Sequence, residues 1–180
     1  MDSPQKRQTQ LNPLFSYLTL LLIAGTVILF DQLTKNWVRD NLALGERWVP
    51  WPDFAPFMRV LNWRNTGAAF GMFQEGGGIF TILAIVVAIM IIYYFPRIQR
   101  GDWALRLAMG LQLGGAVGNL IDRVQHGYVT DFISVANFPV FNIADTSITL
   151  GVVVLLLSIW LGGDDEQAEQ AQVKERLASD

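Results

Sequence analysis

IFTILAIVVAIMIIYYF, residues 79–95, is the clearest indication that the chain crosses a membrane. It contains no charged side chain, and its length is close to the roughly 20 residues with which an α-helix crosses a bilayer. Three glycines at 76–78 precede it, and Pro96 follows it, with Arg97 and Arg100 just beyond. Because both ends are marked by breaking or charged residues, we predict a transmembrane helix over this stretch.

Three further apolar runs predict three more spans: Leu14 to Phe30, about Ala104 to Ile121, and about Thr146 to Leu161. The first lacks a small-residue cleavage site, so we predict a retained span rather than a cleaved signal peptide. The run from Ala104 carries a glycine at every fourth position, which lets another helix approach closely. With 52% hydrophobic residues, a soluble protein with unusually apolar core helices is disfavoured.

The apolar runs divide the chain into one membrane domain and two polar ends. We predict a polar N-terminal segment at 1–13, a single four-span domain at 14–163 and an acidic tail at 164–180. Four spans place both termini on one side, so the connections 31–78 and 122–145 share the other side. Lys and Arg are divided almost evenly between the sides, so the positive-inside rule only leans toward cytoplasmic termini.

The first of these connections is predicted to contain a small sheet. Met58 to Asn65 alternates as a strand does, and Pro50, Pro52 and Pro56 interrupt the aromatic stretch before it. All the tryptophans fall outside the apolar centres of the spans, as interfacial residues do. We therefore predict an all-α membrane protein of four transmembrane helices with a small β-sheet on the membrane surface.

Composition excludes several kinds of chemistry. The chain has no cysteine, which excludes disulfides, thiolate metal sites and cysteine nucleophiles. Its one histidine, His126, makes a histidine metal centre or a Ser-His triad improbable. No polybasic patch indicates nucleic acid binding. We expect no metal and no cofactor.

Three carboxylates at the face of the connections are candidates for function, because ionisable groups at membrane depth are costly. Asp122 ends the third span, and a contact with Arg123 or with the backbone would make it structural. Asp131 lies in an apolar extended stretch with no cationic partner evident in the sequence. Asp145 begins the fourth span, where a helix N-cap is the alternative interpretation.

The sharper hypothesis is that Asp131 and Asp145 meet and share one proton. Such a pair can take a proton from water and donate one to a scissile carbonyl, which is aspartyl peptidase chemistry. Asn119 and Asn142 offer amides that orient the pair or the substrate. Asp31 and Lys35 lie four residues apart and are predicted to pair and to brace the first span.

Other classes of protein compete with this interpretation. A small transporter or channel would also gather polar groups and glycines, but spans 79–95 and 146–161 have almost no polar group near the bilayer midplane. A noncatalytic assembly subunit would use the aspartates as caps and ion-pair partners. A serine-lysine peptidase has only Lys35 at this face, and no serine with an obvious place beside it.

Five blocks of the sequence resemble the bacterial lipoprotein signal peptidases, also called signal peptidase II. In order along the chain they are Asp31-Gln-Leu-Thr-Lys35, Asn65-Thr-Gly67-Ala68-Ala-Phe70, Gly114-Gly-Ala-Val-Gly118-Asn119-Leu-Ile-Asp122-Arg123, Gly127-Tyr-Val129-Thr-Asp131-Phe132 and Phe141-Asn142-Ile-Ala144-Asp145. Each block is weak alone, but five in this order are specific. The resemblance implies that Asp131 and Asp145 are the catalytic dyad, in agreement with the argument from burial.

The resemblance also implies a substrate and a location. The substrates are prolipoproteins that carry diacylglycerol on a cysteine and are cut just before that cysteine. The implied fold has four transmembrane helices and a surface β-cradle in the first extracytoplasmic connection, with cytoplasmic termini and the active site on the outer face of the bacterial inner membrane. Membrane lipids are the other expected partners, a monomer is expected, and inhibition by cyclic peptides such as globomycin is implied.

Supporting roles follow for the remaining polar residues of the blocks. For substrate positioning or dyad support we expect Asn65, Asn119, Arg123 and Asn142. For structural support we expect Asp31, Lys35 and Asp122. Gly67, Ala68 and Phe70 are expected to shape a loop.

Overall fold

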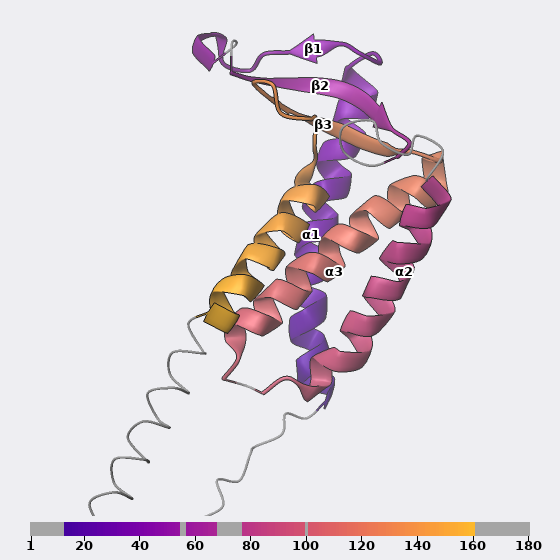
Figure 1. Cartoon of the computed structure of the whole chain (residues 1–180). Helices are drawn as coiled ribbons and strands as arrows, with labels where there is room; N and C mark the ends of the chain where they lie inside the picture. The colour runs from indigo at the N-terminus through magenta and orange to yellow at the C-terminus, as the bar shows by residue number, and fades with distance from the viewer. Residues whose placement is uncertain (1–12, 55–56, 68–76, 100, 161–180) are drawn as a thin grey trace, which may run out of the picture.

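Four long helices stand side by side in the computed structural model, which describes residues 13–54, 57–67, 77–99 and 101–160 (Figure 1). They are α1 (Pro13–Asn41), α2 (Gly77–Tyr94), α3 (Trp103–His126) and a last helix over Ile143–Trp160. All four are long and apolar enough to cross a membrane, as predicted. The predicted tail 164–180, segment 1–12, Ala68 and Phe70 lie outside the described residues.

Three helices extend beyond their apolar runs at one end of the bundle. Helix α3, whose run was predicted to end near Ile121, continues to His126. The apolar run that opens the chain ends at Phe30, but α1 continues through Asp31 and Lys35 to Asn41. The last helix begins at Ile143 rather than at Thr146. The extensions of α1 and α3 are largely polar, so hydropathy alone could not detect them, whereas the last helix gains Ile143, Ala144 and Asp145. The extensions bring charged and amide side chains into regular helical positions at one end of the bundle.

The central helix of the bundle is α3. Half of its most apolar window is buried, compared with 17–22% for the other three helices. The predicted glycine stripe faces α1. A Cβ atom placed on Gly110, Gly114 or Gly118 would come within 2.6–2.8 Å of a side-chain atom of Ile23, Val27 or Asp31, respectively. Because these positions lack a side chain, the two helices pack closely.

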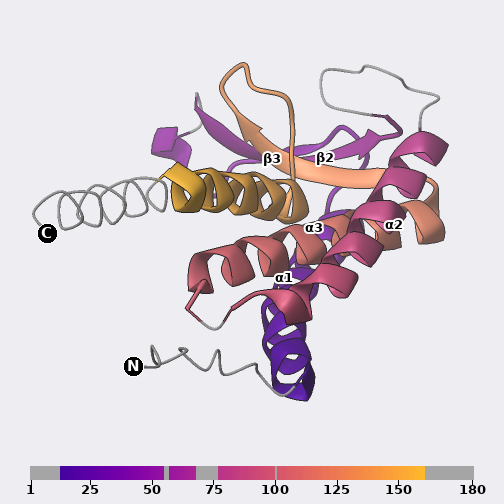
Figure 2. The same ribbon diagram turned by 60° about the horizontal axis from the view of Figure 1, so that its bottom comes forward.

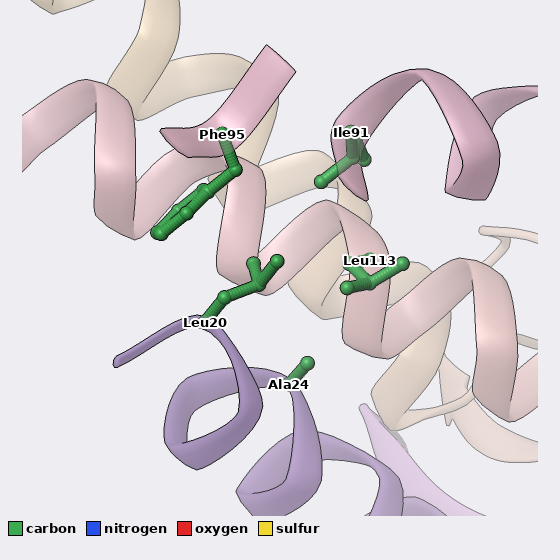
Figure 3. Packing of buried hydrophobic residues seen from close by; sticks show 5 residues of the cluster. All are labelled: Leu20, Ala24, Ile91, Phe95 and Leu113. Carbon is green, nitrogen blue, oxygen red and sulfur yellow. The ribbon is translucent and has the colours of Figure 1, made fainter. Parts of the chain in front are cut away.

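A small apolar core lies between α1, α2 and α3 (Figure 3). It is formed by Leu20 and Ala24 of α1, Ile91 of α2, Leu113 of α3, and Phe95 of the short 3₁₀ helix η3 (Phe95–Arg97). Arg106 lies beside this core and is only 6% exposed, with its guanidinium 4.5 Å from the Phe95 ring centroid. Arg106 therefore packs against this core.

The opposite surfaces of the helices are apolar and exposed. Examples are Leu21 on α1, Ile82 on α2 and Ile159 on the last helix, each at least 64% exposed. In a soluble protein such surfaces would be buried, so in this bundle they are suited to lipid. Together with the four candidate spans, they identify a multi-pass membrane protein.

A three-stranded antiparallel sheet lies across one end of the bundle (Figures 1 and 2). Its strands are β1 (Arg47–Trp48), β2 (Met58–Asn65) and β3 (Val129–Val135), in that order, and a 3₁₀ helix, η1 (Pro52–Phe54), lies between β1 and β2 in the chain. The predicted strand at 58–65 is confirmed. The sheet also takes β3 from the second connection, so both connections meet at this end. The first described residues of α1 and the end of the last helix lie at the opposite end (Figure 1).

Candidate active site

Asp131 occupies the middle of β3 and is 1% exposed. It lies opposite Trp63 in the antiparallel pairing with β2. Asn65, the last residue of β2, donates a hydrogen bond from Nδ2 to Asp131 Oδ2 at 2.9 Å. The register of two strands from different connections therefore sets the position of this carboxylate and of one of its donors.

Asp145 lies in the first turn of the last helix. Asn142 is the N-cap residue, because its Oδ1 accepts a hydrogen bond from the Asp145 N–H at 2.9 Å. In return, Asp145 Oδ2 accepts from the Asn142 N–H at 3.2 Å. This reciprocal pair is a capping box with aspartate in place of glutamate. The N-cap role considered for Asp145 thus belongs to Asn142.

The two aspartates are joined through Asn142. Its Nδ2 donates to Asp131 Oδ1 at 2.7 Å, while its backbone N–H donates to Asp145. Both carboxylates also line one cavity of about 500 Å³. Two acids 14 positions apart in sequence therefore face the same space, on a strand and on a helix that the chain places side by side at the sheet end of the bundle.

Three asparagines direct their amide groups at these two carboxylates. Each asparagine oxygen accepts from a group that can only donate: the Gly67 N–H for Asn65 (3.0 Å), the Lys35 ammonium for Asn119 (2.8 Å) and the Asp145 N–H for Asn142 (2.9 Å). The amide nitrogens must then face the acids, and Asn119 Nδ2 donates to Asp145 Oδ1 at 2.8 Å. As a result, every oxygen of the two carboxyl groups accepts a hydrogen bond from an asparagine.

Lys35 lies at the centre of a buried ion cluster behind the aspartates. Its ammonium is 2.8 Å from Asp31 Oδ2 and 3.5 Å from Asp122 Oδ2, and all three side chains are fully buried. The expected pair of Asp31 and Lys35 is therefore present. Asp31 also accepts from the Ala144 N–H at 2.9 Å, so a carboxylate of α1 satisfies a free N–H at the start of the last helix.

Of the two contacts considered for Asp122, the one with the backbone is present and no hydrogen bond or ion pair with Arg123 is found among the described residues. Arg39 Nη1 is 3.2 Å from Asp122 Oδ1, and the Thr130 N–H donates to Asp122 Oδ2 at 2.8 Å. Arg39 also donates to Thr130 Oγ1 at 2.7 Å. The sequence reasoning missed Arg39 and Thr130, although Arg39 lies one helical turn beyond Lys35 and so shares its face. Because Thr130 precedes Asp131, this cluster also fixes the strand that carries the acid.

Arg123 lies at the wall of the cavity. Its Nη1 donates weakly to the Asn119 carbonyl oxygen at 3.5 Å, and its guanidinium is 5.8 Å from the Phe80 ring centroid. It forms no ion pair with any of the described residues, so its charge is available to a ligand. Of the residues predicted for the site, Asn65, Asn119, Arg123, Asp131 and Asp145 line this cavity, and Asn142 lies behind it.

The surroundings of Asp131 favour its protonated form. Burial and the nearby Asp145 charge raise the pKa of Asp131 to about 7, while hydrogen bonds from Asn65 and Asn142 and the charge of Lys35 act in the opposite direction. Burial penalises the charged carboxylate, and a second negative charge close by adds to that penalty. Near neutral pH the site is thus suited to hold a proton on one acid.

The walls of the cavity are mainly apolar. Besides the polar residues, they are formed by Phe80 of α2, by the segment 138–141 before the last helix, and by Ile148 and Leu150 of that helix. The cavity therefore joins a polar end that carries two acids to an apolar surface along membrane helices. Such a site can receive a group that is partly embedded in lipid.

The comparisons with known proteins agree on one family. The family model described as Signal peptidase (SPase) II matches residues 23–161. The lipoprotein signal peptidase of Shouchella clausii is 41% identical, with 81% of this chain and 95% of the relative covered. That of Bacillus subtilis is 40% identical, with 83% and 97% covered.

Solved structures agree with this result. A bacterial membrane enzyme solved by the in meso method at 2.3 Å resolution is 34% identical, with a TM-score of 0.76 and coverage of 82% of this chain and 90% of the other. A second such structure, at 1.9 Å resolution, is 35% identical with a TM-score of 0.70 and coverage of 78% and 92%. Sequence, fold and structural likeness together show that the chain belongs to the signal peptidase II family.

Proposed function

We propose that the chain is an aspartyl endopeptidase that removes signal peptides from prolipoproteins, with Asp131 and Asp145 as its catalytic residues. The observation that carries this proposal is the single cavity that both acids line, with Asn142 hydrogen-bonded to each. The lipoprotein signal peptidases among its relatives support the substrate class. Family membership favours a peptidase over a transporter or a noncatalytic subunit.

The reaction requires one proton shared by the two acids. The ionised carboxylate removes a proton from water, whose oxygen attacks the scissile carbonyl carbon, while the protonated acid donates to the carbonyl oxygen. The tetrahedral intermediate then breaks its C–N bond, and a proton moves to the departing nitrogen as the carbonyl forms again. No covalent bond to the enzyme is made, and the pair returns to its starting protonation.

The other polar residues hold this pair in place. Asn65, Asn119 and Asn142 orient the acids through their amides, and Arg123 at the cavity wall is suited to a substrate carbonyl. The buried cluster of Asp31, Lys35 and Asp122 braces α1, α3 and the start of the last helix. These are roles in positioning and structure rather than in proton transfer.

The substrate is proposed to be a prolipoprotein with diacylglycerol on a cysteine, cut just before that cysteine. Acyl chains keep such a substrate in the bilayer, and the apolar cavity wall along membrane helices fits that requirement. The sheet end is proposed to face outward from the bacterial inner membrane, with both termini cytoplasmic. We also propose a monomer whose cavity accepts cyclic peptide inhibitors such as globomycin.

The test is cleavage by purified protein in detergent. The wild type should cleave a lipidated prolipoprotein but not its unlipidated form, whereas Asp131→Asn and Asp145→Asn should remain folded and lose at least about a thousandfold in turnover, because the general acid or base is gone. Asp53→Asn, a change at an exposed residue of η1, is the matched control and should retain full activity. Near-normal turnover by either dyad variant would refute the assignment.

A further inference from the structure

A second, narrower groove leaves the active site along α3. It has a volume of about 280 Å³ and shares Phe80, Asn119, Arg123, Asp145 and Ile148 with the larger cavity. The rest of the groove is lined by three apolar residues of α2, which are Leu83, Ala84 and Val87. Two residues of α3, Gln112 and Ala116, complete it. The groove therefore continues from Asp145 along the membrane helices, between α2 and α3.

Gln112 carries the amide at the deep end of this groove. Residues 112, 116, 119 and 123 follow the spacing of one helical face, and all four line the groove. Gln112 precedes Asn119 by seven residues, which places it about 10 Å deeper along the helix axis at 1.5 Å per residue. The α2 residues at the deep end and Ala116 are all apolar, so this amide is the polar group that a ligand would meet there.

The protein leaves room for the Gln112 side chain, but no described residue forms a hydrogen bond with its amide. A Cβ atom at Gly151 of the last helix would come within 2.8 Å of Gln112 Cγ, so the absence of a side chain at 151 leaves room for the glutamine stem. The Gln112 amide takes part in none of the side-chain hydrogen bonds within the described ranges. Gln112 is half-buried and lines the groove, so its amide is free to form a hydrogen bond with a ligand there.

We propose that Gln112 hydrogen-bonds the backbone of the signal peptide about three residues before the scissile bond. Asn119 contacts Asp145, so its level on α3 marks the position of the acids. An extended chain advances about 3.3 Å per residue, so three residues cover the roughly 10 Å along α3 from the level of Asn119 to Gln112. A segment extended for cleavage leaves backbone N–H and C=O groups unpaired in the membrane. The glutamine amide matches both groups, whereas the esters of a diacylglyceryl group offer acceptors only.

This inference rests on the proposed peptidase function and adds a specificity-determining residue to it. The experiment measures kcat and KM for the wild type and Gln112→Met, which keeps the side-chain length and removes the amide. With a lipidated peptide substrate, the variant should raise KM roughly three- to fifteen-fold, the range of an interhelical hydrogen bond in a membrane, and leave kcat within about twofold. Gln99→Met, at an exposed position outside the groove, is the matched control and should change neither constant.

A substrate series then identifies the partner group. Replacing the backbone amide three residues before the scissile bond by an ester should raise the wild-type KM, and the Gln112→Met effect should largely disappear with that substrate. An ester six residues before the bond should leave the effect intact. Replacing the acyl esters of the lipid by ethers should also leave it intact.

Three results would overturn the proposal. They are an unchanged KM in Gln112→Met, an equal effect with all backbone substrates, and loss of the effect only with the ether-linked lipid. If Gln112→Met does not fold, as judged by thermal unfolding in detergent, Gln112→Leu takes its place with the same expectations. Cleavage by the wild type tests the peptidase function separately, since it does not depend on Gln112.

Discussion

At the scale of single residues, the site depends on asparagines whose orientation is determined by their neighbours. Lys35 shows how this works. It neutralises Asp31 and Asp122, and it also holds the Asn119 oxygen, so that the amide nitrogen must face Asp145. A buried cation thereby acts on Asp145, one of the two proposed catalytic acids, through an intervening amide. Lys35 is a positioning residue in this arrangement.

Removing Lys35 should therefore affect both stability and catalysis. We expect Lys35→Met to lower the free energy of unfolding by about 3–5 kcal/mol, because it leaves two buried carboxylates without their shared cation. In the molecules that remain folded, kcat should fall more than KM rises, since Asn119 is free to turn. Thermal unfolding and steady-state kinetics measure the two effects. Arg47→Met, at an exposed residue of β1, is the control and should change neither stability nor kinetics. A wild-type kcat in folded Lys35→Met would contradict the positioning role.

The raised pKa of Asp131 predicts how stability depends on pH. In the unfolded chain this carboxyl titrates near pH 4, and in the folded protein its pKa is about 7. Between these values the folded state binds more protons, so the contribution of Asp131 to stability is present below about pH 4 and is lost as the pH rises to about 7. Asp131→Asn should therefore flatten the fall in melting temperature between pH 4 and 7. An identical pH profile in variant and wild type would contradict this.

At the level of secondary-structure elements, each face of α3 contacts a different part of the protein. Its glycine face packs on α1, and a second face, which includes Gly115, is covered by the start of the last helix. The face with Asn119 and Arg123 lines the cavity and the groove beside α2. Helix α3, with 24 residues, can pack against all of these elements because its glycines let α1 and the last helix approach closely.

A methyl group on the glycine face should separate α1 from α3. At Gly114 a Cβ would lie 2.6 Å from Val27 Cβ and 3.0 Å from the Ala24 carbonyl oxygen, neither of which can move freely. Gly114→Ala should therefore cost about 1–3 kcal/mol in thermal stability. Gly25→Ala is the matched control, because a Cβ there meets nothing within 4 Å, and it should be neutral or slightly stabilising.

At the scale of the whole molecule, the sheet joins the two connections into one structure. Strand β3 belongs to the connection after α3, yet it pairs along most of its length with β2 from the connection after α1. Because β3 carries Asp131 and β2 ends with Asn65, the same pairing that closes this end of the bundle also assembles part of the proposed active site. Disruption of the sheet should therefore reduce activity as well as stability.

The proposed orientation can be measured directly, because the chain contains no cysteine. Single cysteines at Asn137, which is exposed at the sheet end, and at Gln99, which is exposed at the opposite end, provide two reporters. In spheroplasts of an expressing bacterium, a membrane-impermeant thiol reagent should label Asn137→Cys at once and Gln99→Cys only after permeabilisation. The reverse pattern would place the sheet in the cytoplasm and contradict the proposed location.

Local patterns in the sequence predicted much of the architecture. Four apolar runs predicted four spans, and alternation at 58–65 predicted β2, because hydrophobicity and periodicity act over neighbouring residues. The polar continuation of α1 was less evident. Hydropathy stops at Phe30, although the four-residue spacing of Asp31, Lys35 and Arg39 carries a helical signal that runs on toward Asn41.

The four apolar runs were enough to place Asp122, Asp131 and Asp145 at one end of the bundle, since an even number of crossings brings both connections to the same side. The partners of each acid became evident only in the folded chain: Arg39 and Lys35 for Asp122, Asn65 and Asn142 for Asp131, Asn119 and Asn142 for Asp145. Contacts between distant segments depend on helix rotation and strand register. These are set by packing over the whole bundle, which no local pattern contains.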